Sequence, residues 1–231
     1  MRIQRLVCPL TTATWIRRVK VKSYSMTVLL LVMDPLLLPI AAACYFYGAI
    51  PFSYVFTYLA SGKRIYEAGS RNVGVSNAFV VGGLIAGFLT VFGEVSKVFV
   101  CIAAADVLFG GSIDVVLLLV FSAFVGTLFP VFLKGRGSVG STMQGFALFV
   151  LSTPTAIVFC VTIGVVYWLL KDKRRVPIIA EALLPVMLLV IEQTVGWVLF
   201  GLCTTALFLL KYRNRHDDVE YLPWRGGLNR A

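Results

Sequence analysis

The sequence predicts an all-α, polytopic integral membrane protein with about seven short transmembrane helices. Hydrophobic residues make up 59% of the 231-residue chain and charged residues 14%. Soluble domains average about 45–50% apolar and about 25% charged residues. Several apolar runs reach the roughly 17–25 residues that a membrane helix needs. These runs lack the alternation of apolar and polar residues that a transmembrane barrel requires, so we expect helices throughout.

The apolar runs give the expected spans in chain order. A first helix at about 37–60 contains Pro51, which a membrane helix tolerates as a kink. The run 143–170 is either one long helix or two short helices hinged at Pro154. The remaining spans are expected at 78–105, 115–133, 178–192 and 195–211.

The charges of the loops favour two crossings within 143–170. Basic residues concentrate in 61–77, 134–142, 171–177 and the tail after residue 211, whereas 106–114 and 192–194 carry acids and no base. With two crossings, every basic loop falls on one side of the membrane, as the positive-inside rule expects. The C-terminus is then cytoplasmic. The basic N-terminal tail lies outside, unless 26–36 adds a crossing or the tail is cleaved.

Three segments are expected: a basic N-terminal tail at 1–25, a membrane domain at 26–215 and a polar C-terminal tail at 216–231. The first segment contains six basic residues and no acid. It fits a cytoplasmic or surface-binding tail, an organellar targeting peptide, or a start codon placed too far upstream. A targeting peptide implies an organellar membrane; otherwise we expect the inner plasma membrane, with the functional site on its cytoplasmic face.

Two glycine-rich polar loops mark the candidate site. Residues 69–77 read Gly-Ser-Arg-Asn-Val-Gly-Val-Ser-Asn, without an acid. Glycine-bearing loops can turn backbone amides toward an oxyanion, and Ser and Asn add donors. A helix expected to start near Asn77, a good N-cap residue, would add the positive end of its dipole. The second loop, 134–142, also combines glycines with cations, but it lacks the Walker pattern.

Two ionisable residues, Glu94 and Lys97, are expected inside the second span. Their spacing of three residues places them on one helix face. Charged groups at membrane depth usually pair and line a functional interior. A structural ion pair explains them, and so does a substrate-facing lysine that the glutamate neutralises. The five cysteines are irregularly spaced and fit small buried hydrophobic residues, and we see no metal-ligand spacing.

The expected topology brings the loops 69–77 and 134–142 and the segment 211–215 to one face. Convergent cations and amides without a nucleophile suggest the binding of phosphorylated substrates. Chemistry would then depend on positioning and charge neutralisation. Most of the basic residues lie between or beside apolar runs, where the positive-inside rule places them, so the net charge of +10 does not by itself indicate nucleic-acid binding.

These motifs resemble those of the bacterial acyl-phosphate-dependent glycerol-3-phosphate acyltransferases. Residues 69–77 are similar to that family's Gly-Ser-Gly-Asn-x-Gly-x-Thr-Asn, and Glu94-x-x-Lys97 to its acidic-x-x-Lys. Phe129-Pro130-Val131-Phe132-Leu133-Lys134 resembles the approach to its second motif, and Tyr212-Arg213-Asn214-Arg215 its Tyr-Arg-His-Arg. The similarity covers about residues 40–220. The chain departs from the family at Val139, where a lysine is usual, and at Thr127 and Asn214, where histidines are usual.

The resemblance implies transfer of a fatty acyl group from acyl phosphate to the 1-hydroxyl of glycerol 3-phosphate. It implies no cofactor, metal or covalent enzyme intermediate. The implied partners are the two substrates and membrane lipids, with no nucleic acid and no protein partner evident. The implied catalytic residues are Ser70, Asn72, Lys97 and Arg215. The implied phosphate- and substrate-binding residues are Gly69, Gly74, Asn77, Glu94, Lys134, Arg136, Gly137, Ser138, Gly140, Arg213 and Asn214.

Two alternatives stay open. The departures at Val139, Thr127 and Asn214 fit a relative that has lost catalysis or changed its substrate. A small membrane transporter is the other alternative, because ionisable residues in spans also mark permeation paths. Donors gathered in loops on one face favour an interfacial enzyme, whereas a transporter would spread its charges through the depth of the bilayer.

Overall fold

The computed structural model describes residues 34–172 and 174–213. All regular secondary structure in this part of the chain is helical, which confirms the predicted class. The elements are α3 (Leu37–Gly48), α4 (Phe52–Ser61), α5 (Val75–Phe109), α6 (Ile113–Leu128), the 3₁₀ turn η1 (Val131–Leu133), α7 (Ser141–Leu151), α8 (Thr153–Leu170), α9 (Arg175–Glu192) and α10 (Val195–Tyr212). The tails 1–25 and 216–231, most of 26–36, and the site residues Asn214 and Arg215 lie outside the described residues.

The first expected span consists of two helices. α3 ends at Gly48 and α4 begins at Phe52, and Pro51 at the junction has φ −87° and ψ 73°. Proline has no N–H to continue a helical ladder, and it disfavours helical geometry in the residue before it. The kink predicted at Pro51 is therefore confirmed, and Leu37–Ser61 together remain long and apolar enough to cross a membrane.

α5 is longer than the predicted 78–105, and its start corrects one expectation. The helix begins at Val75 with Gly74 as N-cap, so Asn77 is not the capping residue. Gly83, with φ 81° and ψ −174°, interrupts the helix, because glycine adopts such a conformation without the steric cost of a side chain. Asp106 lies in α5 rather than in a loop, so the expected loop 106–114 shrinks to the short turn before α6.

The long apolar run 143–170 is divided into two helices, as the loop charges predicted. α7 ends at Leu151, and Ser152 leaves helical geometry with φ −144° and ψ 79°. The Ser152 hydroxyl accepts a hydrogen bond from the Thr155 N–H at 3.3 Å and caps α8. Pro154 sits in the first turn of α8, where its missing N–H costs little.

Five segments of the described chain are long and apolar enough to span a bilayer: Leu37–Ser61, Val75–Phe109, Ile113–Leu133, Thr153–Leu170 and Val195–Tyr212. α7, with 11 residues, is about 16 Å long at 1.5 Å per residue, which is less than the roughly 30 Å hydrocarbon core. α9 carries Arg175, Glu181 and Glu192 along its length. Helices α7 and α9 would complete the seven predicted crossings, and that count stays a prediction.

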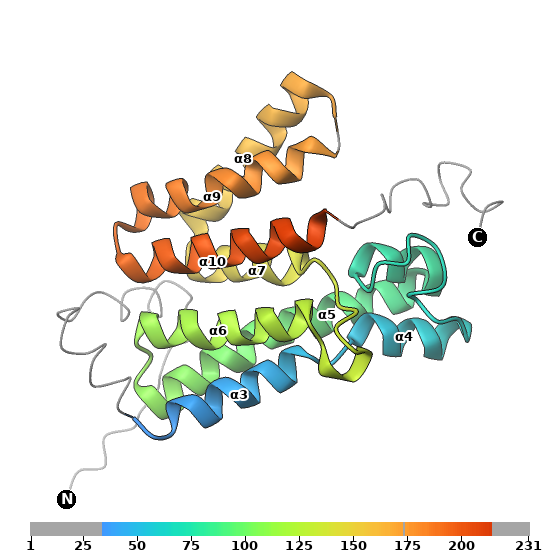
Figure 1. Ribbon diagram of the computed structural model, residues 1–231, viewed down its shortest axis with the longest axis horizontal. Coiled ribbons are helices and arrows are strands. Elements are labelled where there is room, and N and C mark those ends of the chain that lie inside the picture. The colour runs from blue at the N-terminus through green and yellow to red at the C-terminus, as the bar shows by residue number, and fades with distance from the viewer. Residues whose placement is uncertain (1–33, 173, 214–231) are drawn as a thin grey trace, which may run out of the picture.

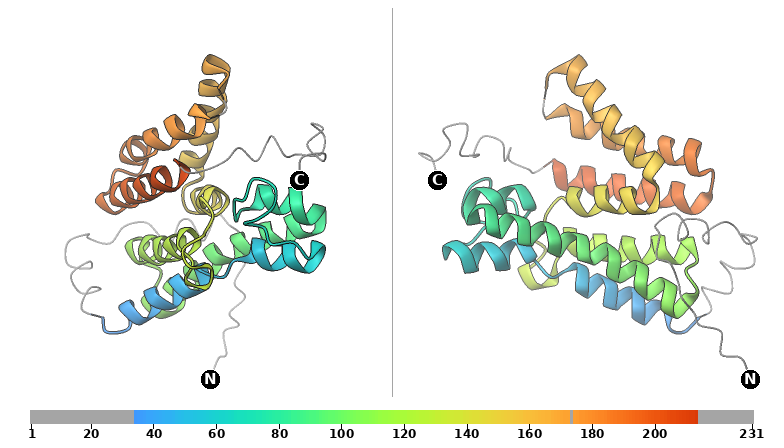
Figure 2. Two further views of the ribbon diagram at one scale, coloured as in Figure 1. Left: turned by 45° about the vertical axis from the view of Figure 1, so that its right-hand side comes forward. Right: turned by 180° about the vertical axis from the view of Figure 1, so that it is seen from behind.

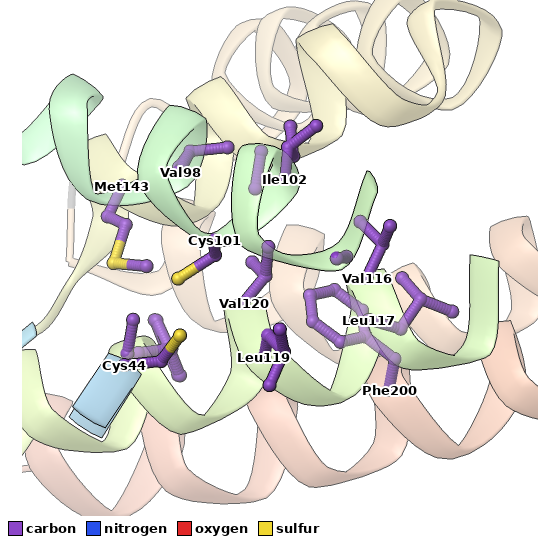
Figure 3. Packing of buried hydrophobic residues seen from close by; sticks show 14 of the residues in the cluster. Cys44, Val98, Cys101, Ile102, Val116, Leu117, Leu119, Val120, Met143 and Phe200 are labelled. Carbon is purple, nitrogen blue, oxygen red and sulfur yellow. The ribbon is translucent and has the colours of Figure 1, made fainter. Parts of the chain in front are cut away.

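The helices form two groups that meet along α6, α7 and α10 (Figures 1 and 2). α3, α5 and α6 lie side by side, with α4 against the N-terminal part of α5. α8 and α9 form a hairpin on the side of α7 and α10 that faces away from α3 and α5. Figure 3 shows part of the buried hydrophobic cluster, to which Cys44, Cys101 and Leu119 from three helices and Phe200 of α10 all belong. Both cysteines are buried, as expected of small hydrophobic residues, whereas Cys160 and Cys203 are exposed.

α3 and α6 approach so closely that glycine is required on both helices. A Cβ on Gly48 would overlap the backbone of Ala123, and a Cβ on Gly126 would overlap the carbonyl of Tyr45. Small residues at such crossings let membrane helices pack backbone to backbone. This contact holds α6, and therefore Thr127, at a fixed distance from the end of α3.

Replacing Gly126 with alanine should destabilise the fold, because overpacking of a tight contact costs about 1–3 kcal/mol. The matched control is Gly164→Ala in α8, where no atom lies within 4 Å of the added Cβ. That variant should unfold at the wild-type temperature or above, because alanine favours a helix by up to about 1 kcal/mol over glycine. Thermal unfolding in detergent checks both, and equal midpoints for the two variants would contradict the tight α3–α6 contact.

Candidate functional site

Asn77 organises the first polar loop from the inside. Its side chain is fully buried, and its Oδ1 accepts a hydrogen bond from the Ser70 N–H at 3.2 Å. Its Nδ2, which has two hydrogens, lies 2.9–3.1 Å from the carbonyl oxygens of Ile65, Ala68 and Asn72, so two of them share one hydrogen. Because these bonds occupy both ends of the amide, Asn77 supports the loop and does not point into a cavity. It provides hydrogen-bond partners for buried backbone groups of the loop, which an apolar environment would otherwise leave unsatisfied.

Gly69 and Ser70 belong to the same internal support. Gly69 has φ 59°, and a Cβ there would overlap the Asn77 side chain. Ser70 is 3% exposed, and its Oγ accepts from the Asn72 N–H at 3.4 Å. Gly69, Ser70 and Asn77 therefore support the loop from its buried side. Asn72 and Gly74 lie on its less buried side.

A cavity of about 100 Å³ lies where α5 and α7 begin. The N-caps of these helices are Gly74 and Gly140, and neither helix has a side-chain cap. The first helical bonds run from the Ala78 N–H to Gly74 and from the Gln144 N–H to Gly140, so the amides before them lack helical partners. Two positive dipole ends thus meet at one cavity, an arrangement that suits an anion. Its lining is Asn72, Gly74, Val75, Ser76, Glu94, Ser138, Val139, Gly140, Ser141, Thr142 and Met143.

A second, smaller cavity adjoins the first and contains the buried charge pair. The Lys97 Nζ lies 2.8 Å from the Glu94 Oε1, and Lys97 is 1% exposed. This confirms that the two residues share one helix face. Lys97 also donates to the Thr127 Oγ1 at 3.1 Å. Glu94 and Ser138 line both cavities, so the lysine lies beside the cavity at the helix N-termini.

The two polar loops meet at this site, and a glycine in the second loop allows its close approach to α6. A Cβ on Gly74 would lie 3.7 Å from the Cβ of Ser138. A Cβ on Gly137 would overlap the carbonyls of Thr127 and Leu128 at the end of α6. The structure therefore brings together a subset of the predicted residues along the two cavities: Asn72, Gly74, Glu94, Lys97, Gly137, Ser138 and Gly140.

The predicted cations do not gather in the cavities. Lys134, Arg136 and Arg213 are exposed and absent from both linings, and the Arg136 guanidinium lies 5.7 Å from the Tyr66 ring centre. Among the described residues, Lys97 is the cation that lines a cavity. Long cationic side chains at a membrane surface can extend into water, which accounts for their position outside the two cavities.

Four residues that the structure places at or near the site lie in the predicted segments but were not predicted as site residues. Ser141 and Thr142 follow Gly140 directly and open α7 onto the larger cavity; their position after a glycine-rich loop was the available signal. Ser76 lines the same cavity from the first turn of α5. Lys211 donates to the Gly135 carbonyl at 2.9 Å and lies 4.6 Å from the Phe129 ring centre, so it ties α10 to the second loop.

The site contains donors, one buried cation and a carboxylate. No cluster of three metal-ligating side chains occurs within residues 34–172 and 174–213. The fold and the cavities define a multi-pass, all-helical protein with a polar cavity between two helix N-termini. The chain belongs to the glycerol-3-phosphate acyltransferase family, because residues 36–219 match the family model described as glycerol-3-phosphate acyltransferase.

Curated relatives and solved structures agree with this membership. A glycerol-3-phosphate acyltransferase from Syntrophomonas wolfei is 31% identical over 178 residues, covering 77% of this chain and 90% of the relative. A Bradyrhizobium enzyme of the same name is 31% identical over 180 residues, covering 77% of this chain and 89% of the relative. The crystal structure of PlsY (YgiH), an integral membrane glycerol 3-phosphate acyltransferase in its glycerol 3-phosphate form, matches with a TM-score of 0.66 at 22% identity. The match covers 82% of this chain and 93% of the PlsY chain, so the fold is that of a multi-pass integral membrane protein.

Replacing Asn77 with aspartate should loosen the first loop, because a carboxylate cannot donate to the three carbonyls that Asn77 now binds. An unsatisfied buried polar group costs about 1–3 kcal/mol, and a charged group more. We expect faster protease cleavage within 61–77 and a lower unfolding temperature. Lys63→Ala, an exposed change in the same loop, should leave both unchanged. Equal cleavage rates for the two variants would contradict the supporting role of Asn77.

Proposed function

We propose that this chain transfers a fatty acyl group from acyl phosphate to the 1-hydroxyl of glycerol 3-phosphate, which yields lysophosphatidic acid and inorganic phosphate. Family membership over residues 36–219 supports this reaction. The observation that carries it is the junction of the two cavities, where the N-termini of α5 and α7 adjoin the Lys97–Glu94 pair. Both substrates carry phosphate groups, and this junction supplies backbone amides together with one buried cation.

The proposed reaction proceeds by direct attack. The glycerol oxygen bonds to the acyl carbonyl carbon, and the carbon–oxygen bond to phosphate then breaks with its electron pair on the departing phosphate. A phosphate oxygen of the substrate accepts the hydroxyl proton, since no histidine occurs among the described residues that line the cavities. The protein contributes orientation and charge stabilisation, which act strongly where water is excluded.

The residues take separate roles in this proposal. Asn72, Gly74, Ser138 and Gly140 present donors to a phosphate, together with the first amides of α5 and α7. Lys97 neutralises negative charge on the bound phosphate, and Glu94 orients the lysine. Of the predicted catalytic residues, Ser70 therefore acts by shaping the loop, as do Gly69 and Asn77.

The exposed cations Lys134, Arg136 and Arg213 would raise the local concentration of anionic substrates. Arg215 and Asn214 follow Arg213 in the sequence, and the family resemblance extends the same site to them. The acyl chain would lie between helices on the lipid side. We propose an inner plasma membrane location with the site facing the cytoplasm, where the positive-inside rule directs the basic loops.

One observation favours a second candidate, a relative with a changed substrate or no turnover. Val139 stands where the family motif usually has a lysine, and it is 5% exposed in the lining of the larger cavity. An apolar side chain removes one cation from that wall. If this change abolishes acyl transfer, the cavity would retain affinity for phosphate esters, because the backbone amides of α5 and α7 do not depend on the side chain at 139.

The first test is turnover. Purified protein in detergent is given palmitoyl phosphate with and without glycerol 3-phosphate, and inorganic phosphate and lysophosphatidic acid are measured in parallel. We expect phosphate release that requires glycerol 3-phosphate and equals product. Absence of turnover in folded protein that still binds glycerol 3-phosphate would support the second candidate, and absence of both would contradict the proposed function.

Replacing Lys97 with methionine should lower turnover by about 100-fold or more, in line with the loss of one preorganised charge-stabilising donor. Because this change leaves Glu94 without its partner, the double variant Lys97→Met/Glu94→Gln serves as a folding control with a neutral pair. It should fold and remain slow. Exposed Arg64→Ala should keep the wild-type rate. Near-wild-type turnover in Lys97→Met would remove this lysine from the mechanism.

A further inference from the structure

We propose that Thr127 is a positioning residue whose hydroxyl holds the Lys97 ammonium at the junction of the two cavities. The inference rests on the proposed function, since it assigns how one member of that site is oriented. Thr127 is 5% exposed near the C-terminal end of α6 and belongs to neither polar loop. Its hydroxyl joins three helices through hydrogen bonds, and none of these bonds was foreseen from the sequence pattern.

The Thr127 hydroxyl has defined donor and acceptor partners. Its Oγ1 lies 3.1 Å from the Lys97 Nζ and 3.1 Å from the Gly48 carbonyl oxygen. An ammonium can only donate and a carbonyl can only accept. The hydroxyl therefore accepts from Lys97 and donates its one hydrogen toward Gly48, with the Met143 sulfur at 3.4 Å as a weaker second acceptor.

The anchor at Gly48 is rigid. Its carbonyl belongs to the last residue of α3, and Gly48 packs against the backbone of Ala123 on α6. The position of the Thr127 hydroxyl is therefore set by backbone packing rather than by a mobile side chain. A lysine side chain has several freely rotating bonds, so without such an acceptor its ammonium would have more than one accessible position.

These contacts leave one direction for the third Lys97 hydrogen. Glu94 and Thr127 accept two of the three ammonium hydrogens, at 2.8 Å and 3.1 Å. The Phe52 ring centre lies 5.4 Å away. Lys97, Gly137 and Ser138 share the lining of the smaller cavity, and the described residues supply no third oxygen acceptor for the ammonium. The smaller cavity measures about 10 Å³, which is room for about one small group. In this inference a single phosphate oxygen that reaches in from the larger cavity takes that place, so Thr127 sets the direction in which the charge is presented.

The test compares Thr127→Val, which has nearly the same shape without the hydroxyl, with Thr127→Ser, which retains it. We expect kcat to fall about tenfold or more in Thr127→Val, with KM for glycerol 3-phosphate changed by less than about threefold, because misplacement of a catalytic group acts mainly on the transition state. Thr127→Ser should recover most of the rate. Equal kcat in Thr127→Val and wild type, or failure of Thr127→Ser to recover the rate in folded protein, would overturn the inference.

A double-mutant cycle separates positioning from a general structural role. If Thr127 acts through Lys97, Thr127→Val should cause no further loss in a Lys97→Met background, since the group it positions is already absent. A purely structural effect would lower the rate by the same factor in both backgrounds and would contradict the inference. Unfolding temperatures of all four proteins show whether the lost bond to Gly48 alone loosens the fold.

A second readout does not require turnover. Inorganic phosphate should raise the unfolding temperature of the wild type. The rise should be smaller for Thr127→Val, and for Thr127→Ser it should be almost as large as for the wild type. If the wild type shows no acyl transfer but the phosphate response follows this order, the proposed function fails and the positioning role stands. If wild-type turnover is present and both Thr127 variants match it in rate and phosphate response, the positioning role fails alone.

Discussion

The buried Lys97–Glu94 ion pair is the interaction on which the rest of the site depends. A charge in an apolar interior is costly unless it is paired and hydrogen-bonded. Here the pairing is local to α5, and Thr127 of α6 gives the lysine a second acceptor. Because Thr127 in turn binds the end of α3, helices α3, α5 and α6 keep a common register at the level of the cavities. Glycines at the α3–α6 crossing make that register possible.

Glycines also leave backbone amides, rather than side chains, as the main donors of the proposed binding surface. Gly74 and Gly140 precede α5 and α7 and leave their first amides uncapped. Gly137 lets the second loop lie against the end of α6. The result is a site whose positive potential comes from helix N-termini and one lysine, with most loop cations outside it.

The sequence predicted the helical class, the kink at Pro51, the division of the run 143–170 near Pro154, and the common face of Glu94 and Lys97. These follow from local rules of proline chemistry, hydropathy and helical periodicity. It did not predict that Asn77 faces inward, that α5 starts at Val75, or that Thr127 holds Lys97. Such features depend on contacts between residues distant in the chain, and residue type or spacing alone does not determine them.

The proposed function requires that phosphate binds between the N-termini of α5 and α7, beside Lys97. The most direct measurement is a crystal structure with tungstate, a heavy phosphate analogue, located by its anomalous scattering. We predict a peak within hydrogen-bonding distance of the first amides of both helices and of the Lys97 Nζ. A peak at the exposed Arg136 and Arg213, with none at the helix N-termini, would contradict the claim and move the site to the loop cations.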